Sequence, residues 1–216
     1  MKNCFIFCAG QCAPLHQIIG PDDVIIAADG GLAHVQKFCL TPHVILGDFD
    51  SLGYVPEGAE VHPVEKDDTD SMLAIKKGLE LGCDTFYLYG ALDGQRVDHT
   101  MANFQALQYL SERRCRGFLV GCRQIATAIT NGSLVLPAYF EGYLSLFCLG
   151  KDATGVQIRG TKYTLQNASL SSGFPLGVSN QFIGEPSQIS VEDGTLLLIW
   201  PNHNDPQQFN LKEGIS

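Results

Sequence analysis

The side chains most suited to catalysis are aspartates that follow apolar runs of the chain. Three runs end in Asp and Gly: Val24–Ala28 in Asp29-Gly30-Gly31, Val44–Leu46 in Gly47-Asp48-Phe49-Asp50, and Phe86–Tyr89 in Gly90-Ala91-Leu92-Asp93-Gly94. Ligands of open α/β sheets bind outside the carboxyl ends of the strands, so these runs, taken as strands, predict one shared crevice. Asp supplies hard oxygen ligands for Mg²⁺, and Gly lets the backbone approach a ligand closely.

Two further polar clusters precede segments with a helical pattern. They are Asp67-Asp68-Thr69-Asp70 and Arg96-Val97-Asp98-His99. Asp or Thr at a helix N-terminus can act simply as a cap, and a single carboxylate is enough for that. Three acids within four residues repel one another, which favours a bound cation. We therefore expect Mg²⁺ at this acidic cluster and at Asp48 and Asp50, where the alternative is an ordinary turn.

A magnesium site of this composition suits a substrate that carries phosphates. Mg²⁺ usually takes few protein carboxylates and keeps waters or phosphate oxygens as its other ligands. Arg96 can hold phosphate oxygens through its planar guanidinium, or it can form an ordinary surface salt bridge. His99 is equally suited to a structural role and to acid–base catalysis. The sequence contains neither G-x-x-x-x-G-K-[ST] nor G-x-G-x-x-G, which excludes an ordinary P-loop kinase.

Composition and charge narrow the class of protein. The chain has 216 residues, of which 45% are hydrophobic and 17% charged, so it can bury a core. Its net charge is −9, which argues against a nucleic-acid binder. No apolar run approaches the roughly 20 residues of a membrane span, and the apolar N-terminal stretch is shorter than a secretory signal usually is. We therefore expect a cytoplasmic protein that does not enter the membrane and whose eight cysteines are free, buried thiols.

The elements that must position the acidic residues alternate between strand and helix in the first half of the chain. Helical patterns occur at Leu32–Phe38, Ser71–Leu81 and Thr100–Leu110. The apolar strand patterns are Cys4–Ala9, Val24–Ala28, Val44–Leu46, Phe86–Leu88 and Phe118–Val120. Short, fully apolar strands separated by helices predict an α/β domain, with a mostly parallel sheet covered by helices on both faces.

The second half of the chain has a different pattern, with short strands and almost no helical period. The strand patterns are Ser133–Leu136, Tyr143–Leu149, Gly155–Ile158 and Leu196–Trp200, separated by turn signals such as Gly142 and Gly150. This pattern predicts an all-β sandwich or barrel-like domain. We place the boundary between Arg123 and Thr130, which gives an α/β domain over residues 1–125 and an all-β domain over residues 126–216.

Taken together, these motifs resemble those of thiamine pyrophosphokinases. The N-terminal motifs match that family in order and spacing: Asp29-Gly30-Gly31, Gly47-Asp48-Phe49-Asp50-Ser51, Lys66-Asp67-Asp68-Thr69-Asp70, and Gly94-Gln95-Arg96-Val97-Asp98-His99 with Asn103. Downstream, its β-domain motifs are similar to Gly160-Thr161-Lys162-Tyr163-Thr164-Leu165 and Gly177-Val178-Ser179-Asn180. The resemblance covers nearly the whole chain, and one departure is Tyr163, where many members carry tryptophan.

The resemblance implies an enzyme that transfers the terminal diphosphate of ATP to the hydroxyl of thiamine, with AMP as the second product. The family uses Mg²⁺ and forms homodimers. Its thiamine site lies where the α/β domain of one subunit meets the β-domain of the other. On this resemblance the N-terminal domain is catalytic and binds the nucleotide, and the C-terminal domain binds thiamine and forms the dimer.

The resemblance also implies roles for single residues. The catalytic set it implies is Asp48, Asp50, Asp70, Arg96 and Asp98, with Asp98 as a metal ligand or a base. The implied metal ligands are Asp48, Asp50, Asp67, Asp70 and Asp98. The implied nucleotide contacts are Asp29, Gly30, Gly31, Gly47, Lys66, Thr69, His99 and Asn103. The implied thiamine contacts are Tyr163, Ser179 and Asn180, although Ser-Asn is also typical of a turn. Trp200 ends an apolar run and is expected in the core.

Two other functions fit part of the pattern. Asp48-x-Asp50 after an apolar run also resembles the motif of aspartyl-nucleophile phosphatases. In those enzymes the motif usually follows the first strand, whereas two strand patterns precede it here. A non-catalytic nucleotide or thiamine sensor would need the crevice but not the full set of carboxylates, because unused clustered charge destabilises a fold.

Overall fold

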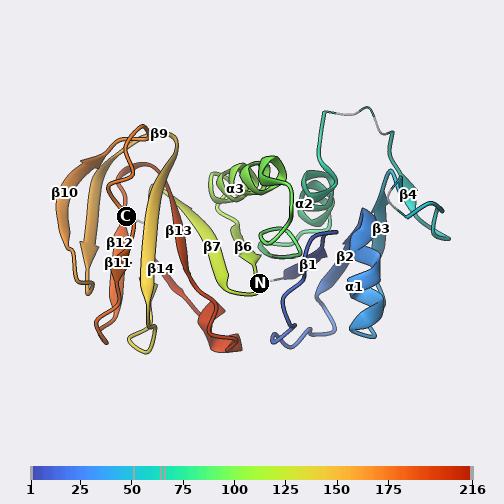
Figure 1. Ribbon diagram of the computed structural model, residues 1–216, viewed down its shortest axis with the longest axis horizontal. Helices are drawn as coiled ribbons and strands as arrows, with labels where there is room; N and C mark the ends of the chain where they lie inside the picture. The colour runs from blue at the N-terminus through green and yellow to red at the C-terminus, as the bar shows by residue number, and fades with distance from the viewer. Residues whose placement is uncertain (1, 51, 64, 66, 215–216) are drawn as a thin grey trace. The chain divides into compact units, whose positions relative to one another are not determined.

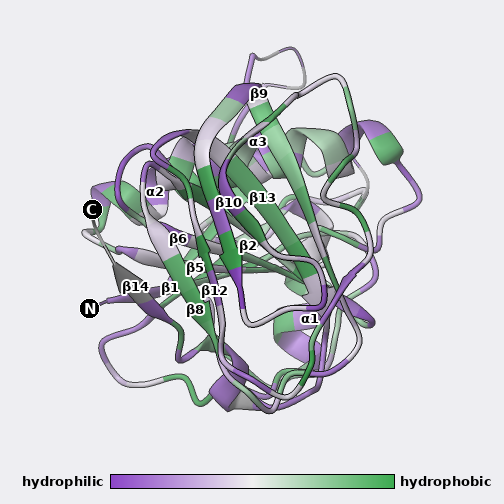
Figure 2. Ribbon diagram, turned by 90° about the vertical axis from the view of Figure 1, so that its left-hand side faces the viewer, coloured by the Kyte–Doolittle hydropathy of each residue, from purple (hydrophilic) through white to green (hydrophobic). Residues whose placement is uncertain are grey.

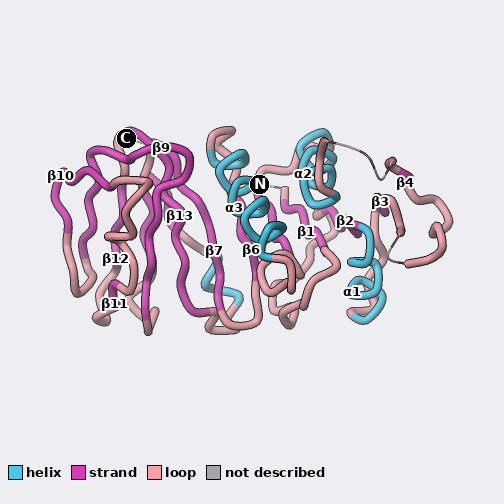
Figure 3. Tube along the Cα trace, turned by 45° about the horizontal axis from the view of Figure 1, so that its top comes forward, coloured by secondary structure: helices cyan, strands magenta, loops and turns pink. Residues whose placement is uncertain are grey.

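The computed structural model describes residues 2–50, 52–63, 65 and 67–214, and it forms two compact units. The first unit contains the chain up to Ala106 together with Arg114–Cys122. The second contains Leu107–Arg113 and the chain from Arg123 onward. In the described residues the first unit combines helices and strands and the second consists mostly of strands, which together make a mixed α/β fold (Figures 1 and 3).

The first unit contains a parallel sheet whose strand order is β6-β5-β1-β2-β3-β4. Every neighbouring pair in it is parallel. The strands are β1 (Asn3–Phe7), β2 (Val24–Ala28), β3 (Val44–Gly47), β4 (Glu60–Val61), β5 (Thr85–Tyr89) and β6 (Arg116–Val120). Since β2 and β5 are buried along their whole length, both faces of the sheet centre are covered, as the unbroken apolar runs predict.

The helices of the first unit follow its strands, and the last of them extends into the second unit. They are the 3₁₀-helix η1 (Asp29–Gly31) and the α-helices α1 (Leu32–Lys37), α2 (Asp70–Glu80) and α3 (Val97–Ser111). Thr69 caps α2, because its side chain accepts a hydrogen bond from the Met72 N–H at 3.2 Å. Gly82 follows α2 with φ +79°, the left-handed conformation that ends many helices. Helices α1 and α2 pack against β1 and β2.

The second unit is built from antiparallel strand pairs. Its strands are β7 (Gln124–Thr130), β8 (Ser133–Leu136), β9 (Tyr143–Arg159), β10 (Leu165–Leu170), β11 (Asn180–Gln181), β12 (Ser187–Ser190), β13 (Asp193–Pro201) and β14 (Lys212–Gly214), with the 3₁₀-helix η2 (Pro206–Phe209) before the last. Hydrophobic residues concentrate on strands such as β13 (Figure 2). Trp200 on β13 is fully buried, which confirms its predicted place in the core.

Strand β9 corrects one expectation from the sequence. We expected Gly150 to separate two strands, but β9 continues through it for 17 residues. Gly150 adopts φ +74° and Gly155 φ +65°, and the facing β13 shifts register between Asp193 and Thr195. Glycine in these positions lets the strand bend at an irregularity without ending. As a result β9 pairs with β13 and β11 in its first half and with β10 and β12 further on.

Two general expectations can be compared with the described part of the chain. All eight cysteines are free thiols, as predicted, but only Cys4, Cys8 and Cys83 are buried, so the expectation that all would be buried was wrong. None of the described helices has the length and apolar character needed to cross a membrane.

Candidate functional site

Three aspartates meet at the carboxyl ends of two neighbouring strands. Carboxylate oxygens of Asp29, Asp48 and Asp50 lie within 4.8 Å of one another. Asp29 directly follows β2, and the other two follow β3, whose Leu46 pairs with Ala28 of β2. The parallel register therefore brings the two strand ends side by side. Asp29 and Asp48 are partly buried, and Asp50 is exposed.

The backbone around this acidic cluster adopts unusual conformations. Asp29 has φ +47° and Phe49 has φ +58°, both in the left-handed region that residues other than glycine rarely occupy. Phe49 is held there by its side chain, which is only 3% exposed. Gly47 allows the close approach of the two loops, because a Cβ at this position would lie 3.0 Å from the Cα of Asp29. Strained backbone conformations therefore occur where the carboxylates meet, which is typical of functional sites.

The acidic cluster includes some of the predicted metal ligands and excludes others. Asp48 and Asp50 lie in it, together with Asp29, which the sequence placed on the nucleotide side. Among the described residues, Asp67, Asp70 and Asp98 are not part of this group. Asp70 is the first residue of α2, and its charge adds to burial in raising the pKa of Cys8 to about 12.

Thr69 and Asn103, two predicted nucleotide contacts, hydrogen-bond to the protein itself. Thr69 Oγ1 lies 3.0 Å from Ser71 Oγ, which donates to Asn103 Oδ1 at 2.8 Å. Asn103 Nδ2 donates to the carbonyl of Ala91 at 2.7 Å. Asn103 is only 6% exposed. The structure gives this asparagine a role in holding loops, and nothing in the sequence pattern had singled out Ser71.

Arg96 and Asp98 form an ion pair at the start of α3. Arg96 Nη2 lies 2.6 Å from Asp98 Oδ2, and both side chains are about two-thirds exposed, at 68% and 65%. The hydrogen bond from Arg96 holds the pKa of Asp98 below its ordinary value. The same contact raises the pKa of Arg96. An acid with a lowered pKa is a poor proton acceptor, so the pair suits charge stabilisation better than base catalysis.

The predicted glycines of the first unit serve loop packing. A Cβ at Gly31 would lie 1.8 Å from the carbonyl oxygen of Phe7, so only glycine fits where η1 crosses the end of β1. Gly30 precedes it in η1 and is partly buried.

His99 is exposed beside Asp98. The predicted contact Lys66 and the motif residue Ser51 lie outside the described residues.

In the second unit, Asn180 organises the loop that carries Tyr163. Asn180 is 5% exposed, and its Nδ2 donates to Thr161 Oγ1 at 3.0 Å and to the Tyr163 carbonyl at 2.7 Å. Its Oδ1 accepts from the N–H groups of Tyr163 and Gln181 at 2.9 and 2.8 Å. The amide is therefore fully used inside the protein. Ser179 is exposed with φ +60°, and Tyr163 is 61% exposed, so both side chains can meet a ligand.

Large apolar side chains are exposed on the second unit. Besides Tyr163 they are Tyr143, Phe174, Leu176, Val178 and Ile183, which are between 43% and 66% exposed. Tyr143 pairs with Gln181, next to Asn180, so at least part of this apolar set is adjacent to the Tyr163 loop. Contiguous exposed apolar surface is typical of sites that contact a ligand or a partner.

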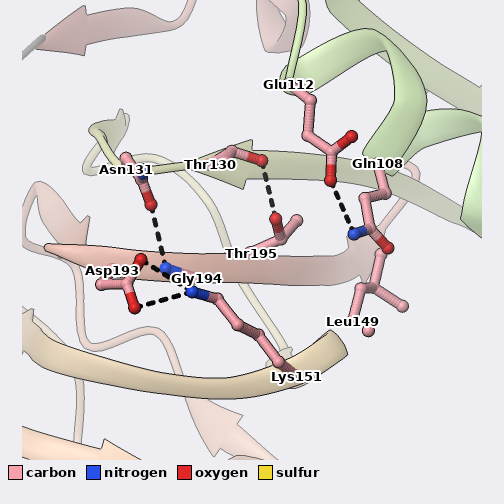
Figure 4. Close-up of a pocket in the computed structure, with 10 residues that line it drawn as sticks. Gln108, Glu112, Thr130, Asn131, Leu149, Lys151, Asp193, Gly194 and Thr195 are labelled. Atoms are coloured by element: carbon pink, nitrogen blue, oxygen red, sulfur yellow. Dashed lines mark hydrogen bonds and ion pairs between the residues drawn. The ribbon is translucent and has the colours of Figure 1, made fainter.

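The second unit also contains a cavity of about 430 Å³ that none of the predicted site residues lines (Figure 4). Its polar groups bind one another. Lys151 Nζ lies 2.7 Å from an Asp193 oxygen, Gln108 Nε2 donates to Glu112 at 2.8 Å, and Thr130 and Thr195 share a 2.8 Å contact between hydroxyls. The lysine contact joins β9 to β13, the threonine contact joins β7 to β13, and the glutamine contact lies at the C-terminal end of α3.

Comparison with known proteins matches both halves of the chain. A family model described as the catalytic domain of thiamin pyrophosphokinase matches residues 15–119, and one described as its vitamin B1 binding domain matches residues 133–196. The thiamine pyrophosphokinase of Bacillus subtilis is 26% identical over 183 residues, which are 81% of this chain and 85% of that protein. Thiamin pyrophosphokinase 1 of Caenorhabditis elegans is 26% identical over 188 residues, 80% and 76% of the two chains.

Solved structures share the fold. The crystal structure of the Bacillus subtilis thiamine pyrophosphokinase superposes with a TM-score of 0.80 at 24% identity, covering 94% of this chain and all of that one. The Geobacillus thermodenitrificans thiamin pyrophosphokinase gives a TM-score of 0.77 at 25% identity, with 94% and 98% coverage. This chain is thus similar to these proteins in sequence motifs and in fold.

Proposed function

The chain belongs to the thiamin pyrophosphokinase family, and on that premise we propose that its acidic cluster of Asp29, Asp48 and Asp50 is where ATP is held for reaction. As a member of the family it is an enzyme that transfers diphosphate from ATP to thiamine and releases AMP. The observation that carries the site assignment is the meeting of three carboxylates within 4.8 Å at the ends of β2 and β3.

The donor set of the acidic cluster fits Mg²⁺. Carboxylate oxygens are the protein ligands that Mg²⁺ prefers, and the cluster offers one from each of three residues. Bound there, Mg²⁺ would offset the negative charge of the phosphates. We propose Asp48 and Asp50 as ligands, with Asp29 beside them. Asp67, Asp70 and Asp98 remain proposed ligands at the neighbouring loop ends.

The main contribution of the protein to this reaction is to position the reactants. The hydroxyl oxygen of thiamine attacks the middle phosphorus of ATP and gives up its proton to solvent. The bond from that phosphorus to the bridging oxygen of AMP breaks, and AMP leaves with the electron pair of that bond. Such transfers are catalysed mainly by alignment and charge stabilisation. Arg96, held by Asp98, has further N–H groups for phosphate oxygens. We assign Arg96 to charge stabilisation.

The nucleotide and thiamine contacts follow from the same placement. Asp29 belongs to the acidic cluster, and Gly30, Gly31 and Gly47 lie in the segments that carry it. We propose that the nucleotide binds along these segments, with Lys66 and His99 as further contacts. Ser179 and Tyr163 are proposed to contact thiamine, since both are exposed next to the buried Asn180. Thr69, Asn103 and Asn180 act through the loops they hold.

We propose residues 1–125 as the catalytic and nucleotide-binding domain and residues 126–216 as the thiamine-binding and dimerisation domain. The matches of the two family models to residues 15–119 and 133–196 support this division. The exposed apolar side chains near Tyr163 support a homodimer with a shared active site, because burying them would remove apolar surface from water. The proposed location is the cytoplasm.

Product analysis tests the function. The purified chain is mixed with ATP, Mg²⁺ and thiamine, and the products are separated by chromatography. Diphosphate transfer gives AMP and thiamine diphosphate in equal amounts. ADP with thiamine monophosphate would indicate a single-phosphate kinase. A phosphoenzyme formed on Asp48 would indicate a phosphatase, and ATP that stays intact with thiamine bound would indicate a sensor.

A further inference from the structure

A chain of side-chain hydrogen bonds joins three segments of the first unit. Thr69 Oγ1 contacts Ser71 Oγ at 3.0 Å, and Ser71 Oγ donates to Asn103 Oδ1 at 2.8 Å. Asn103 Nδ2 then donates to the Ala91 carbonyl at 2.7 Å. This chain of hydrogen bonds therefore runs from the start of α2, through the buried face of α3, to the loop that follows β5.

At its first end, this chain of hydrogen bonds involves the residues on either side of Asp70. Thr69 and Ser71 are its immediate neighbours in sequence, and Thr69 Oγ1 also accepts the Met72 N–H at 3.2 Å. The backbone on both sides of Asp70 is thus tied down by side-chain contacts. Asp70 cannot shift along the helix axis unless these hydrogen bonds break.

The other end lies where the strand order of the parallel sheet reverses. The polypeptide runs from β1 outward through β2, β3 and β4, and then returns to β5 on the other side of β1. Crevices at such switch points bind ligands in open α/β sheets. The loop after β5 is held on its far side by Gly10, whose N–H donates to the Gly90 carbonyl at 3.0 Å. A Cβ at Gly10 would lie 2.4 Å from that same oxygen.

Asn103 is the link between the two ends. Its side chain is 6% exposed, and both its oxygen and its nitrogen hydrogen-bond to protein groups. A ligand at the crevice can hardly reach a side chain so buried. Alanine in its place would leave the Ala91 carbonyl without this donor and would uncouple α2 from the loop.

We propose that Asn103, acting through Ser71, is a positioning residue for diphosphate transfer, which sets the placement of Asp70 relative to the loop at Ala91. This inference rests on the proposed function and deepens it, since the resemblance alone had assigned Asn103 to nucleotide contact. Groups that orient functional residues in this way typically contribute about 10- to 100-fold to activity.

The test compares Asn103→Ala, Ser71→Ala and Ser71→Thr with the wild type by steady-state kinetics of AMP formation at varied ATP. Asn103→Ala is expected to lower kcat by about 10- to 100-fold. Its KM for ATP should stay within about twofold, because no substrate contact is removed. Ser71→Ala should lower kcat in the same way but less, and Ser71→Thr should restore it because the hydroxyl returns.

A matched control lies at the other end of α3. Ser111 Oγ contacts Thr130 Oγ1 at 2.7 Å, so Ser111→Ala removes a comparable hydroxyl contact outside the chain of bonds. Its kcat is expected to equal that of the wild type. Thermal unfolding followed by circular dichroism checks that each variant is folded. If Asn103→Ala does not fold, the Ser71 pair still decides the question.

The outcomes separate this proposal from the function on which it rests. A wild type that forms no AMP and thiamine diphosphate would overturn both. With an active wild type, a tenfold rise in KM for ATP at unchanged kcat in Asn103→Ala would indicate direct nucleotide contact and overturn the positioning role. A Ser71→Ala variant with wild-type kcat would also overturn it, because the bond to Asn103 would then be only structural.

Discussion

The side-chain amide of Asn180 binds both backbone groups of Tyr163, accepting its N–H at 2.9 Å and donating to its carbonyl at 2.7 Å. The backbone of a neighbouring strand would make the same two kinds of hydrogen bond, but here a side chain 17 residues further along the chain makes them. It leaves the Tyr163 ring exposed at the surface. A buried amide thus presents an aromatic side chain in a defined place.

Replacing Asn180 is therefore expected to weaken thiamine binding. In Asn180→Asp the amide donors are lost and a carboxylate faces the Tyr163 carbonyl, which costs about 1–3 kcal/mol of stability. The KM for thiamine should rise while the KM for ATP stays near its wild-type value. Asn167→Asp, an exposed position on β10, serves as the control. Equal thiamine KM values in the two variants would refute the role of Asn180.

The ion pair of Arg96 and Asp98 makes a prediction about pH. Because the hydrogen bond from Arg96 lowers the pKa of Asp98, the folded protein favours the ionised acid. The stability from this effect is present above the unfolded pKa of about 3.9 and is lost as pH falls through the lower folded value. In Arg96→Gln the pKa of Asp98 should rise toward its ordinary value, because the lowering hydrogen bond is gone. Carbon-13 NMR titration of the carboxyl measures it, and an unchanged pKa would show that the pair does not persist in solution.

Cysteine reactivity should follow burial. Burial and the nearby Asp70 raise the pKa of Cys8 to about 12, so its thiol stays protonated at pH 8. Cys39 is exposed on the loop after α1. Brief treatment with iodoacetamide, followed by peptide mass spectrometry, is expected to modify Cys39 first and to leave Cys8 intact. Rapid modification of Cys8 in the folded protein would contradict its buried position at the end of β1.

The close approach of η1 to β1 predicts a strong requirement for glycine. Gly31→Ala would place a Cβ 1.8 Å from the Phe7 carbonyl oxygen. We expect a loss of about 1–3 kcal/mol or more in the free energy of unfolding, measured by urea denaturation. Gly173→Ala is the matched control, since the atom nearest to its new Cβ is a serine oxygen at 3.8 Å. Similar stability of the two variants would show that the loops are not packed as described.

Much of the first unit could be predicted because its strands are buried on both faces. The run Val24–Ala28 coincides with β2, and the helix expected over Ser71–Leu81 is observed one residue earlier, as Asp70–Glu80. The second unit was harder. Gly150 has the same preference for positive φ in a turn as in a strand irregularity, so the local sequence could not show that β9 continues.

The candidate site was predictable where it depends on strand ends and not where it depends on side-chain contacts. Asp48 and Asp50 were expected together because they follow one strand. Asp29 was expected in the same crevice, but its place within the cluster depends on β2 and β3 being neighbours, which the sequence does not specify. The buried roles of Asn103 and Asn180 depend on partners far along the chain, Ala91 and Tyr163, and no local pattern encodes such contacts.

The most direct test of the account is AMP formation by Asp48→Asn, measured by chromatography with ATP, Mg²⁺ and thiamine. The variant keeps the shape of the side chain and removes one charge from the acidic cluster. Asp22→Asn, an exposed position just before β2, removes the same charge elsewhere. We predict that Asp48→Asn folds but loses at least about 100-fold in kcat, whereas Asp22→Asn keeps wild-type turnover. Near-normal formation of AMP and thiamine diphosphate by Asp48→Asn would contradict the claim that this cluster holds the reacting phosphates.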